Sequence, residues 1–359
     1  MIHCRPFRGG YRFETFEGSP SDEIIALFPK VNSNHTPVIR PGELFRVVER
    51  IGFLPPSGEV ERIILNAIDC EPLTLSFNAF LKLRPNLLAE IQTILELIYP
   101  KKPITLAISK KPVIATPHRM EVVELKDIYP QHFSEILASS LADKNFFNTD
   151  DIKREGILIL DRWQVMKIVS SCFEEFGNSD VVVALSGPGV KNPMGYSLPA
   201  GTPISVLLNK RVKSGEWVYV KNSLLNGCMI DTEKGLIDST THAVMVLEKP
   251  QKREFLGFLR LGKRRISYTN TFLSSLIRPK LAENNAEQHG ELRNCIACNS
   301  CDDICPVGIL PAMIYKRIEH GFEDEAKGLK PERCIECGLC TFACPSKIDL
   351  MKSIVSCKL

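Results

Sequence analysis

Two cysteine runs near the C-terminal end constrain this chain more than any other feature. The pattern C-x2-C-x2-C-x3-C-P occurs twice in 359 residues, and the two copies hold eight of the thirteen cysteines. A proline follows the fourth cysteine of each run, where it ends any helix formed by the ligands. The first run contains Cys295, Cys298, Cys301 and Cys305, and the second contains Cys334, Cys337, Cys340 and Cys344.

This spacing is typical of bacterial proteins that bind two [4Fe–4S] clusters. Three thiolates separated by two residues each can wrap one face of a cubane, whereas the fourth points toward the neighbouring cluster. We therefore predict crossed ligation. One cluster would be bound by Cys295, Cys298, Cys301 and Cys344, and the other by Cys334, Cys337, Cys340 and Cys305. Zinc is the alternative, but zinc sites close at four ligands, which suits two complete runs poorly.

The segment that connects the runs predicts a helix. Its sequence, "ILPAMIYKRIEHG", has apolar residues close to a 3.6-residue period, and Gly321 can end the helix. We therefore expect a helical two-cluster domain over residues 287–359. The other five cysteines lack ligand spacing and are interpreted as buried or surface thiols: Cys4, Cys70, Cys172, Cys228 and Cys357.

Composition indicates a soluble globular protein. Apolar residues make up 44% and charged residues 24%, and the net charge of +3 is too small to favour nucleic-acid binding. No apolar stretch approaches the roughly 20 residues that span a bilayer, and the N-terminal residues lack a secretory apolar core. We expect a cytoplasmic protein, where thiols stay reduced and clustered cysteines indicate metal or redox chemistry.

The first 290 residues predict a multidomain α/β fold. Apolar strand-length runs alternate with helical patterns twice, which indicates strand–helix–strand units with parallel pairing. We expect a β-rich module, an α/β unit, a second mixed module, a polar extension and the cluster domain. Their expected bounds are 1–61, 62–155, 156–250, 251–286 and 287–359.

Several segments resemble two related components of membrane redox complexes. "RIILNAIDCEP", "VVVALSGPGVKNP", "LPAGTPISVLL" and "PPSGEV" are similar to segments of the C subunit of the Rnf complex. "VKNSLLNG", "EFLGFLRLGKRRISYTNTFLS" and "CTFACPSK" are similar to the A subunit of Nqr, the sodium-pumping NADH:quinone reductase. The resemblance implies a barrel-sandwich-hybrid-like module, a Rossmann-like unit, a soluble-ligand-binding β-grasp (SLBB) domain and a dicluster ferredoxin domain.

The resemblance also implies a function. It predicts an iron–sulfur subunit that passes electrons between a soluble donor, such as ferredoxin or a dehydrogenase, and integral membrane subunits carrying flavin or iron–sulfur centres. Such a subunit has no catalytic residues of its own and lies peripherally on the inner face of the cell membrane. The basic stretch "RLGKRRIS" at 260–267 is either a solvated loop or a surface that meets anionic headgroups.

This chain departs from the C subunit of Rnf in one feature that affects whether it can bind FMN and NADH. That family carries a Gly-rich stretch before its "ECEP" strand, whereas this chain has no glycine between residues 59 and 71. Backbone amides of such a loop cradle phosphate, so its absence argues against FMN and NADH. Two alternatives stay open: a flavin-dependent NADH reductase similar to cobalamin reductase, and a quinone- or partner-binding adaptor whose clusters are structural.

Overall fold

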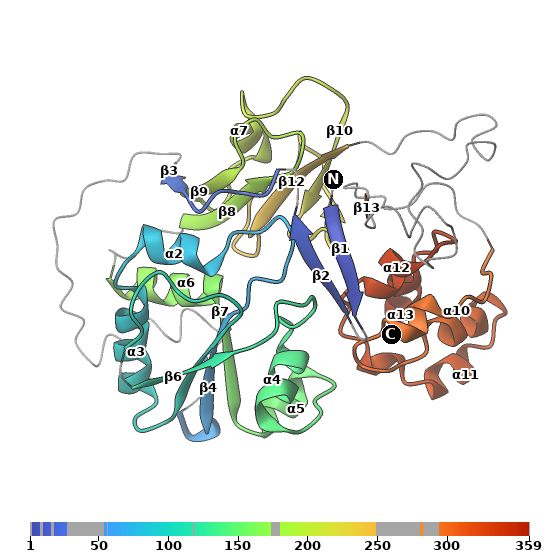
Figure 1. Cartoon of the computed structure of the whole chain (residues 1–359), viewed down its shortest axis with the longest axis horizontal. Coiled ribbons are helices and arrows are strands. Elements are labelled where there is room, and N and C mark those ends of the chain that lie inside the picture. Colours follow the sequence, from blue (N-terminus) through green and yellow to red (C-terminus); the bar gives the residue numbers. More distant parts are fainter. Residues whose placement is uncertain are drawn as a thin grey trace.

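The computed structural model describes most of the chain, as three sheets and a C-terminal group of helices (Figure 1). The described residues are 2–7, 10–15, 18–26, 54–55, 57–117, 119–173, 180–248, 281–282 and 294–358. The expected module over 1–61, the basic stretch and the 251–286 extension lie largely or wholly outside these ranges. None of the described helices is long and apolar enough to cross a membrane.

The first sheet is fully parallel, with strand order β6-β5-β4-β7. Its two central strands are almost continuously apolar and buried, as expected for a parallel sheet covered on both faces. The strands are β4 (Arg62–Ala67), β5 (Ile104–Ile108), β6 (Met120–Glu124) and β7 (Ile157–Asp161). The parallel pairing of the first strand–helix–strand unit is confirmed. That of the second is wrong, because its two strands, 157–161 and 180–186, lie in different sheets.

The boundary expected after residue 155 runs through this sheet. β7 pairs in parallel with β4, from Arg62↔Ile157 to Asn66↔Asp161, so it belongs with the strands of the preceding unit. The following helix, α6 (Arg162–Phe173), also contacts β4 and α3 (Leu87–Ile98). Strand pairing over nearly a hundred residues leaves no local sequence signal, so the sequence alone does not show that β7 joins the earlier strands.

Helices cover the parallel sheet. The first of the two helical patterns forms two helices, α2 (Phe77–Leu83) and α3, because Pro85 interrupts the backbone hydrogen bonding between them. α3 buries one apolar stripe, and Phe80 of α2 packs edge-on against Trp163 at 5.6 Å between ring centroids. The remaining bounds are α4 (Ser134–Ala142) and α5 (Thr149–Arg154).

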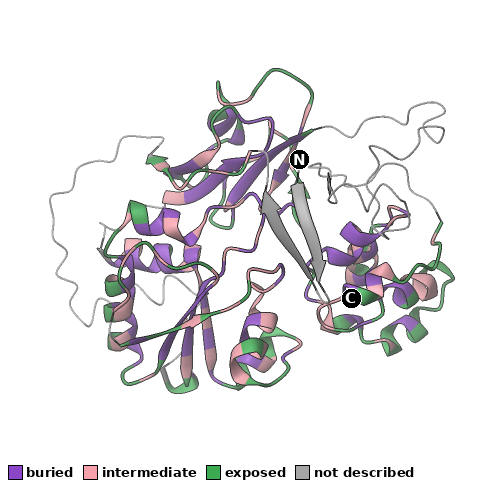
Figure 2. Cartoon of the chain, in the orientation of Figure 1, coloured by how far each residue is buried: buried purple, intermediate pink, exposed green. Residues whose placement is uncertain are grey.

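The second sheet is mixed and has the order β11-β10-β12-β8-β9-β3. Its edge strand β3 comes from the N-terminal part of the chain and pairs in parallel with β9. The other elements are β8 (Asp180–Ser186), β9 (Met194–Pro199), α7 (Ile204–Leu208), β10 (Trp217–Lys221), β11 (Cys228–Met229) and β12 (Ala243–Glu248), with β3 at Ile24–Ala26. Figure 2 shows buried residues concentrated along both larger sheets.

A third, small sheet joins distant parts of the chain. β1 (Ile2–Phe7) and β2 (Gly10–Thr15) form an antiparallel hairpin. β13 (Leu281–Ala282) pairs antiparallel with β1. The N-terminal strand thus contacts the segment that leads into the cysteine runs.

The C-terminal domain is helical, as the sequence predicts. The connector forms a helix that begins at a proline and is followed by Gly321 in the left-handed region, with φ 78°. The helices are α9 (Ser300–Asp303), α10 (Pro311–Glu319), α11 (Glu323–Gly328), α12 (Leu339–Ala343) and α13 (Leu350–Lys358). α10 packs against α11 and α13, which gives the domain its own apolar core.

A buried ion pair fixes the loop after β4 to the start of α6. Arg162 and Asp69 are 5% and 6% exposed, and their side chains hydrogen-bond directly. Arg162 also donates to the Leu75 carbonyl oxygen at 2.6 Å, and Asp69 accepts from the Phe77 amide at 2.8 Å. Removing one member would leave the other charge buried, which is costly.

We expect Arg162→Met to lower the free energy of unfolding by about 3–5 kcal/mol, because it leaves the Asp69 carboxylate without its cation. The matched control is Lys153→Met, which breaks an exposed pair with Asp150 and should change stability by less than about 0.5 kcal/mol. Denaturant unfolding measures both. Equal losses of unfolding free energy in the two variants would show that the buried pair contributes no more to stability than the exposed one.

Candidate iron–sulfur centre

The two cysteine runs adopt the same backbone conformation. In the first run, Ala297 and Asn299 have positive φ angles of 53° and 57°. Their counterparts 39 residues later, Glu336 and Gly338, have φ angles of 58° and 75°. Left-handed residues are rare outside glycine, so their repetition at the same two places shows that both runs turn in the same way.

The repeat extends into the helices that follow. Asp302 accepts a hydrogen bond through Oδ1 from the Ala312 amide, at 2.9 Å. At the corresponding place, Thr341 accepts through Oγ1 from the Met351 amide, also at 2.9 Å. Each bond satisfies an amide in the first turn of its helix, α10 or α13, which has no intrahelical partner. The C-terminal domain is therefore two copies of one loop–helix unit.

The fourth cysteine of each run faces the other run. The Cys305 thiol acts electrostatically on Cys334, Cys337 and Cys340, raising the pKa of each behind the larger effect of burial. Cys344 acts in the same way on Cys301, whose pKa burial raises to about 12. The structure thus brings Cys305 to the second run and Cys344 to the first.

The thiols lie in apolar surroundings that contain backbone donors. Burial raises the pKa of Cys337 to about 12, so this thiol must give up its proton when it binds a metal. The Glu336 amide donates to Cys334 Sγ at 3.4 Å. The amides of residues 307–309 point at Cys305 and lower its pKa against the larger effect of burial. Amide hydrogen bonds of this kind stabilise cluster-bound thiolates and tune their potential.

The residue set fits iron–sulfur clusters, because cysteine thiolates are their usual ligands and the two runs supply eight. Within the described ranges, no three His, Cys, Asp or Glu side chains converge on a point that one ion could occupy. A cubane differs, since each of its four cysteine thiolates binds a separate iron and the sulfurs stay apart.

The two runs differ in exposure. In the first run, Cys298 is exposed and Ile296 is 66% exposed, while Cys301 is buried and Ile304 joins the core of the α/β body. In the second, Cys337 and Cys340 are buried, and Ile335, Leu339 and Phe342 join the core of the α/β body. We call the first run the outer run and the second the inner run.

Three contacts hold the inner run against the body. The buried Tyr129 hydroxyl donates to the Cys337 carbonyl oxygen at 2.6 Å, and Asn226 Nδ2 donates to the Glu336 carbonyl oxygen at 2.9 Å. Gly338 lies directly against the Leu225 backbone, where a Cβ would sit 2.2 Å from the carbonyl oxygen. The sequence gives no signal for these partners, because they lie about 110–210 residues from the run.

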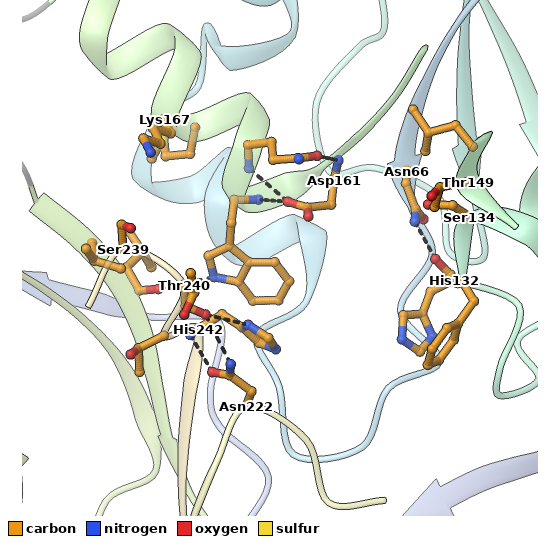
Figure 3. A pocket seen from close by; sticks show the side chains of 18 of the residues that line it. Asn66, His132, Ser134, Thr149, Asp161, Lys167, Asn222, Ser239, Thr240 and His242 are labelled. Carbon is orange, nitrogen blue, oxygen red and sulfur yellow. Dashed lines mark hydrogen bonds between the residues drawn. The ribbon is translucent and has the colours of Figure 1, made fainter. Parts of the chain in front are cut away.

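A cavity of about 1670 Å³ follows β7 over its whole length, includes Asn66 near the carboxyl end of β4, and reaches Ile335 of the inner run. Figure 3 shows Asn66 and His132 on one wall and Asn222 and His242 on the opposite wall. Carboxyl ends of parallel strands are the usual place for ligands in α/β folds. Only the part of the cavity at Ile335 lies beside the second cysteine run.

Three titratable side chains lie together at one end of this region. Cys70 Sγ is 3.2 Å from His132 Nδ1, and His132 Nε2 is 3.8 Å from Glu71 Oε2. Burial lowers the pKa of His132 to about 3, so the imidazole is neutral at pH 7 and its contact with Glu71 is no ion pair. Burial raises the pKa of Glu71 to about 7, against the hydrogen bond from Ser223 and the charge of Arg162.

This constellation does not make Cys70 a nucleophile. Burial raises the pKa of its thiol far above the usual value, and the neutral His132 does not reverse this effect. A reactive cysteine needs a lowered pKa and access to solvent, and Cys70 is 5% exposed. The interpretation of Cys70 as a buried structural thiol agrees with this geometry.

Comparison with known proteins supports the cysteine-run interpretation. The family model described as "4Fe-4S dicluster domain" matches residues 294–348. The A subunit of the Na(+)-translocating NADH-quinone reductase of Aliivibrio salmonicida is 30% identical over 173 residues, which cover 48% of this chain and 39% of the relative. The same protein from Alcanivorax borkumensis is 28% identical over 170 residues, covering 47% and 38%.

These matches confirm the resemblance to the A subunit of Nqr. The chain combines a segment homologous to that protein with a 4Fe–4S dicluster domain, which is consistent with the Nqr/Rnf-type superfamily. It spans about two-fifths of the length of the curated relatives that it matches. Among solved structures, a chain of NAD+-reducing [NiFe]-hydrogenase in the H2-reduced state aligns with TM-score 0.45 and 14% identity, over 58% of this chain and 47% of that chain.

Proposed function

We propose that this chain is the iron–sulfur electron-transfer subunit of an Rnf/Nqr-like, membrane-associated oxidoreductase complex. The observation that carries the proposal is the duplicated cysteine run, with matching left-handed residues in both copies. Two [4Fe–4S] clusters would accept and release single electrons. The chain itself would hold the clusters, exclude water from the buried one and present the other to partners.

We further propose crossed ligation. Cys295, Cys298, Cys301 and Cys344 would hold an outer cluster, and Cys334, Cys337, Cys340 and Cys305 an inner cluster. The electrostatic proximity of Cys305 to the inner run and of Cys344 to Cys301 supports this assignment. The exposed Cys298 makes the outer cluster the one that a partner protein can approach.

The partners in this proposal are a soluble donor, such as ferredoxin or a dehydrogenase, and integral membrane subunits with flavin or iron–sulfur centres. The chain would lie on the cytoplasmic face of the membrane without crossing it. The segment homologous to the A subunit of Nqr supports a place in a complex of several subunits. The SLBB-like identity of the second sheet is part of the same proposal.

Fractionation of host cells tests this placement. We expect the chain in the membrane fraction, released by high salt or carbonate, because a peripheral subunit is held by polar contacts. Recovery of all the protein in the soluble fraction at low salt would contradict membrane association.

A second candidate is a flavin-dependent NADH reductase, and the cavity that reaches Ile335 favours it. A flavin bound there would lie next to the inner run. The sequence lacks the Gly-rich loop before β4 that would cradle its phosphate. Under the leading proposal, the isolated full chain does not copurify with FMN and is not reduced by NADH. Copurified FMN, or reduction of the chain by NADH, would favour the reductase.

A further inference from the structure

We propose that the Asp302 carboxylate holds the reduction potential of the outer cluster below that of the inner cluster, so that electrons pass from the outer to the inner cluster. This inference rests on the proposed function, because it assumes that both clusters are bound. It adds a direction and names the side chain that sets it.

The position of Asp302 brings a negative charge next to a proposed cluster ligand. Its Oδ1 atom lies 3.8 Å from Cys301 Sγ, and the hydrogen bond from the Ala312 amide keeps it there. A nearby carboxylate disfavours the addition of an electron, because the reduced cluster carries one more negative charge. The carboxylate therefore lowers the potential of the outer cluster.

The internal repeat shows that this charge is not needed for the fold. At the corresponding position, Thr341 accepts the same hydrogen bond from the first turn of α13, at the same 2.9 Å, with an uncharged hydroxyl. The two runs share their backbone turns. They therefore differ in the charge of the side chain that follows the third cysteine. The Thr341 hydroxyl also donates to Asp349 Oδ1 at 3.3 Å, so the nearest carboxylate at this place in the inner run lies one hydrogen bond beyond Thr341.

Other charges near the runs add to the difference. Glu336 lies beside Cys334 in the inner run, but Lys358 Nζ contacts its Oε1 atom at 2.6 Å and the Cys334 carbonyl oxygen at 2.6 Å. This cation offsets the glutamate. In the described part of the chain, the ion pairs of the C-terminal domain involve other residues than Asp302.

The proposed direction of transfer begins at the run that a partner can reach. The outer run is accessible through Cys298, whereas the inner run packs on the body beside the cavity. A donor would reduce the outer cluster by one electron. That cluster would then pass the same electron to the oxidised inner cluster, which returns the outer cluster to its oxidised state without moving a proton.

Redox titration of the anaerobically purified full chain, followed by electron paramagnetic resonance, tests the inference. We expect Asp302→Asn, which keeps an oxygen acceptor for Ala312, to raise only the lower of the two midpoint potentials. Thr341→Asp should lower only the higher one. The control Asp303→Asn removes an exposed carboxylate from the same helix and should shift the outer potential less than Asp302→Asn.

A Cys298→Ser variant assigns the potentials, because it should keep only the inner cluster, with the higher midpoint. If wild-type protein binds two clusters and Asp302→Asn moves neither midpoint, or moves the higher one, the inference is wrong while the proposed function stands. If wild-type protein binds no iron, the proposed function itself fails. Iron content measured on every variant separates these outcomes from simple loss of a cluster.

Discussion

The Cys298→Ser/Cys344→Ser double variant should keep about half of the wild-type iron, whereas Cys298→Ser/Cys305→Ser should lose nearly all of it. In the crossed arrangement the first pair removes two ligands from one cluster and leaves the other intact. The second pair removes one ligand from each cluster. Iron analysis after anaerobic purification should give roughly eight irons per chain for the wild type and roughly four for the first variant.

The control for this experiment is Cys357→Ser. Cys357 is a buried cysteine of the same domain, at the end of α13, and belongs to neither run. Its variant should retain the full iron content. Ligation within each run would reverse the two double variants, so that Cys298→Ser/Cys305→Ser keeps half of the iron and Cys298→Ser/Cys344→Ser loses nearly all. That reversal would contradict the crossed assignment.

Gly338→Ala should detach the inner run from the α/β body. Gly338 has φ 75°, and an added Cβ would lie 2.2 Å from the Leu225 carbonyl oxygen, where backbone must move to make room. The variant therefore has two costs. An alanine in the left-handed region is strained by about 1 kcal/mol, and its Cβ also clashes with the Leu225 carbonyl oxygen. We expect loss of the iron of the inner cluster. We also expect faster hydrogen exchange around Tyr129, whose hydroxyl donates to the Cys337 carbonyl oxygen.

Gly321→Ala is the matched control. Gly321 also has a positive φ, 78°, but an added Cβ would meet nothing within 4 Å. This variant should lose only about 1 kcal/mol of stability and keep its iron. If the two alanine variants behaved alike, the contact with Leu225 would not hold the inner run in place.

The dicluster domain could be predicted from the cysteine runs because their signal is local. The spacing within each run, the proline after it and the apolar stripe of α10 all lie within a few residues of one another. The same holds for β4 and β5, whose apolar runs flank two helices. Short-range patterns of this kind fix secondary structure without knowledge of the rest of the chain.

The remainder depends on pairs far apart in the sequence. β7 joins β4 across about ninety residues, and the N-terminal strand β3 completes the second sheet beside β9. Tyr129 meets Cys337 across 208 residues. The sequence around Tyr129 and Cys337 does not indicate that these residues contact each other. The packing of the inner run on the body, and the cavity beside it, are therefore seen only in the structure.

The difference in charge between the two runs shows both what the sequence reveals and what only the structure reveals. Aligning the two runs by their cysteines places Asp302 opposite Thr341, so the difference in charge is present in the sequence. Its meaning depends on the distance of 3.8 Å to Cys301 Sγ and on the shared hydrogen bond to the next helix. Only the structure supplies these two facts.

Redox titration of the wild-type chain decides whether the two cysteine runs carry electrons. The chain is purified without oxygen, poised at a series of potentials and examined by electron paramagnetic resonance together with iron and sulfide analysis. The account predicts two reversible low-potential signals at separate midpoints, with roughly eight irons per chain. A single signal, zinc in place of iron, or clusters that resist reduction would contradict an electron-transfer role for the two cysteine runs.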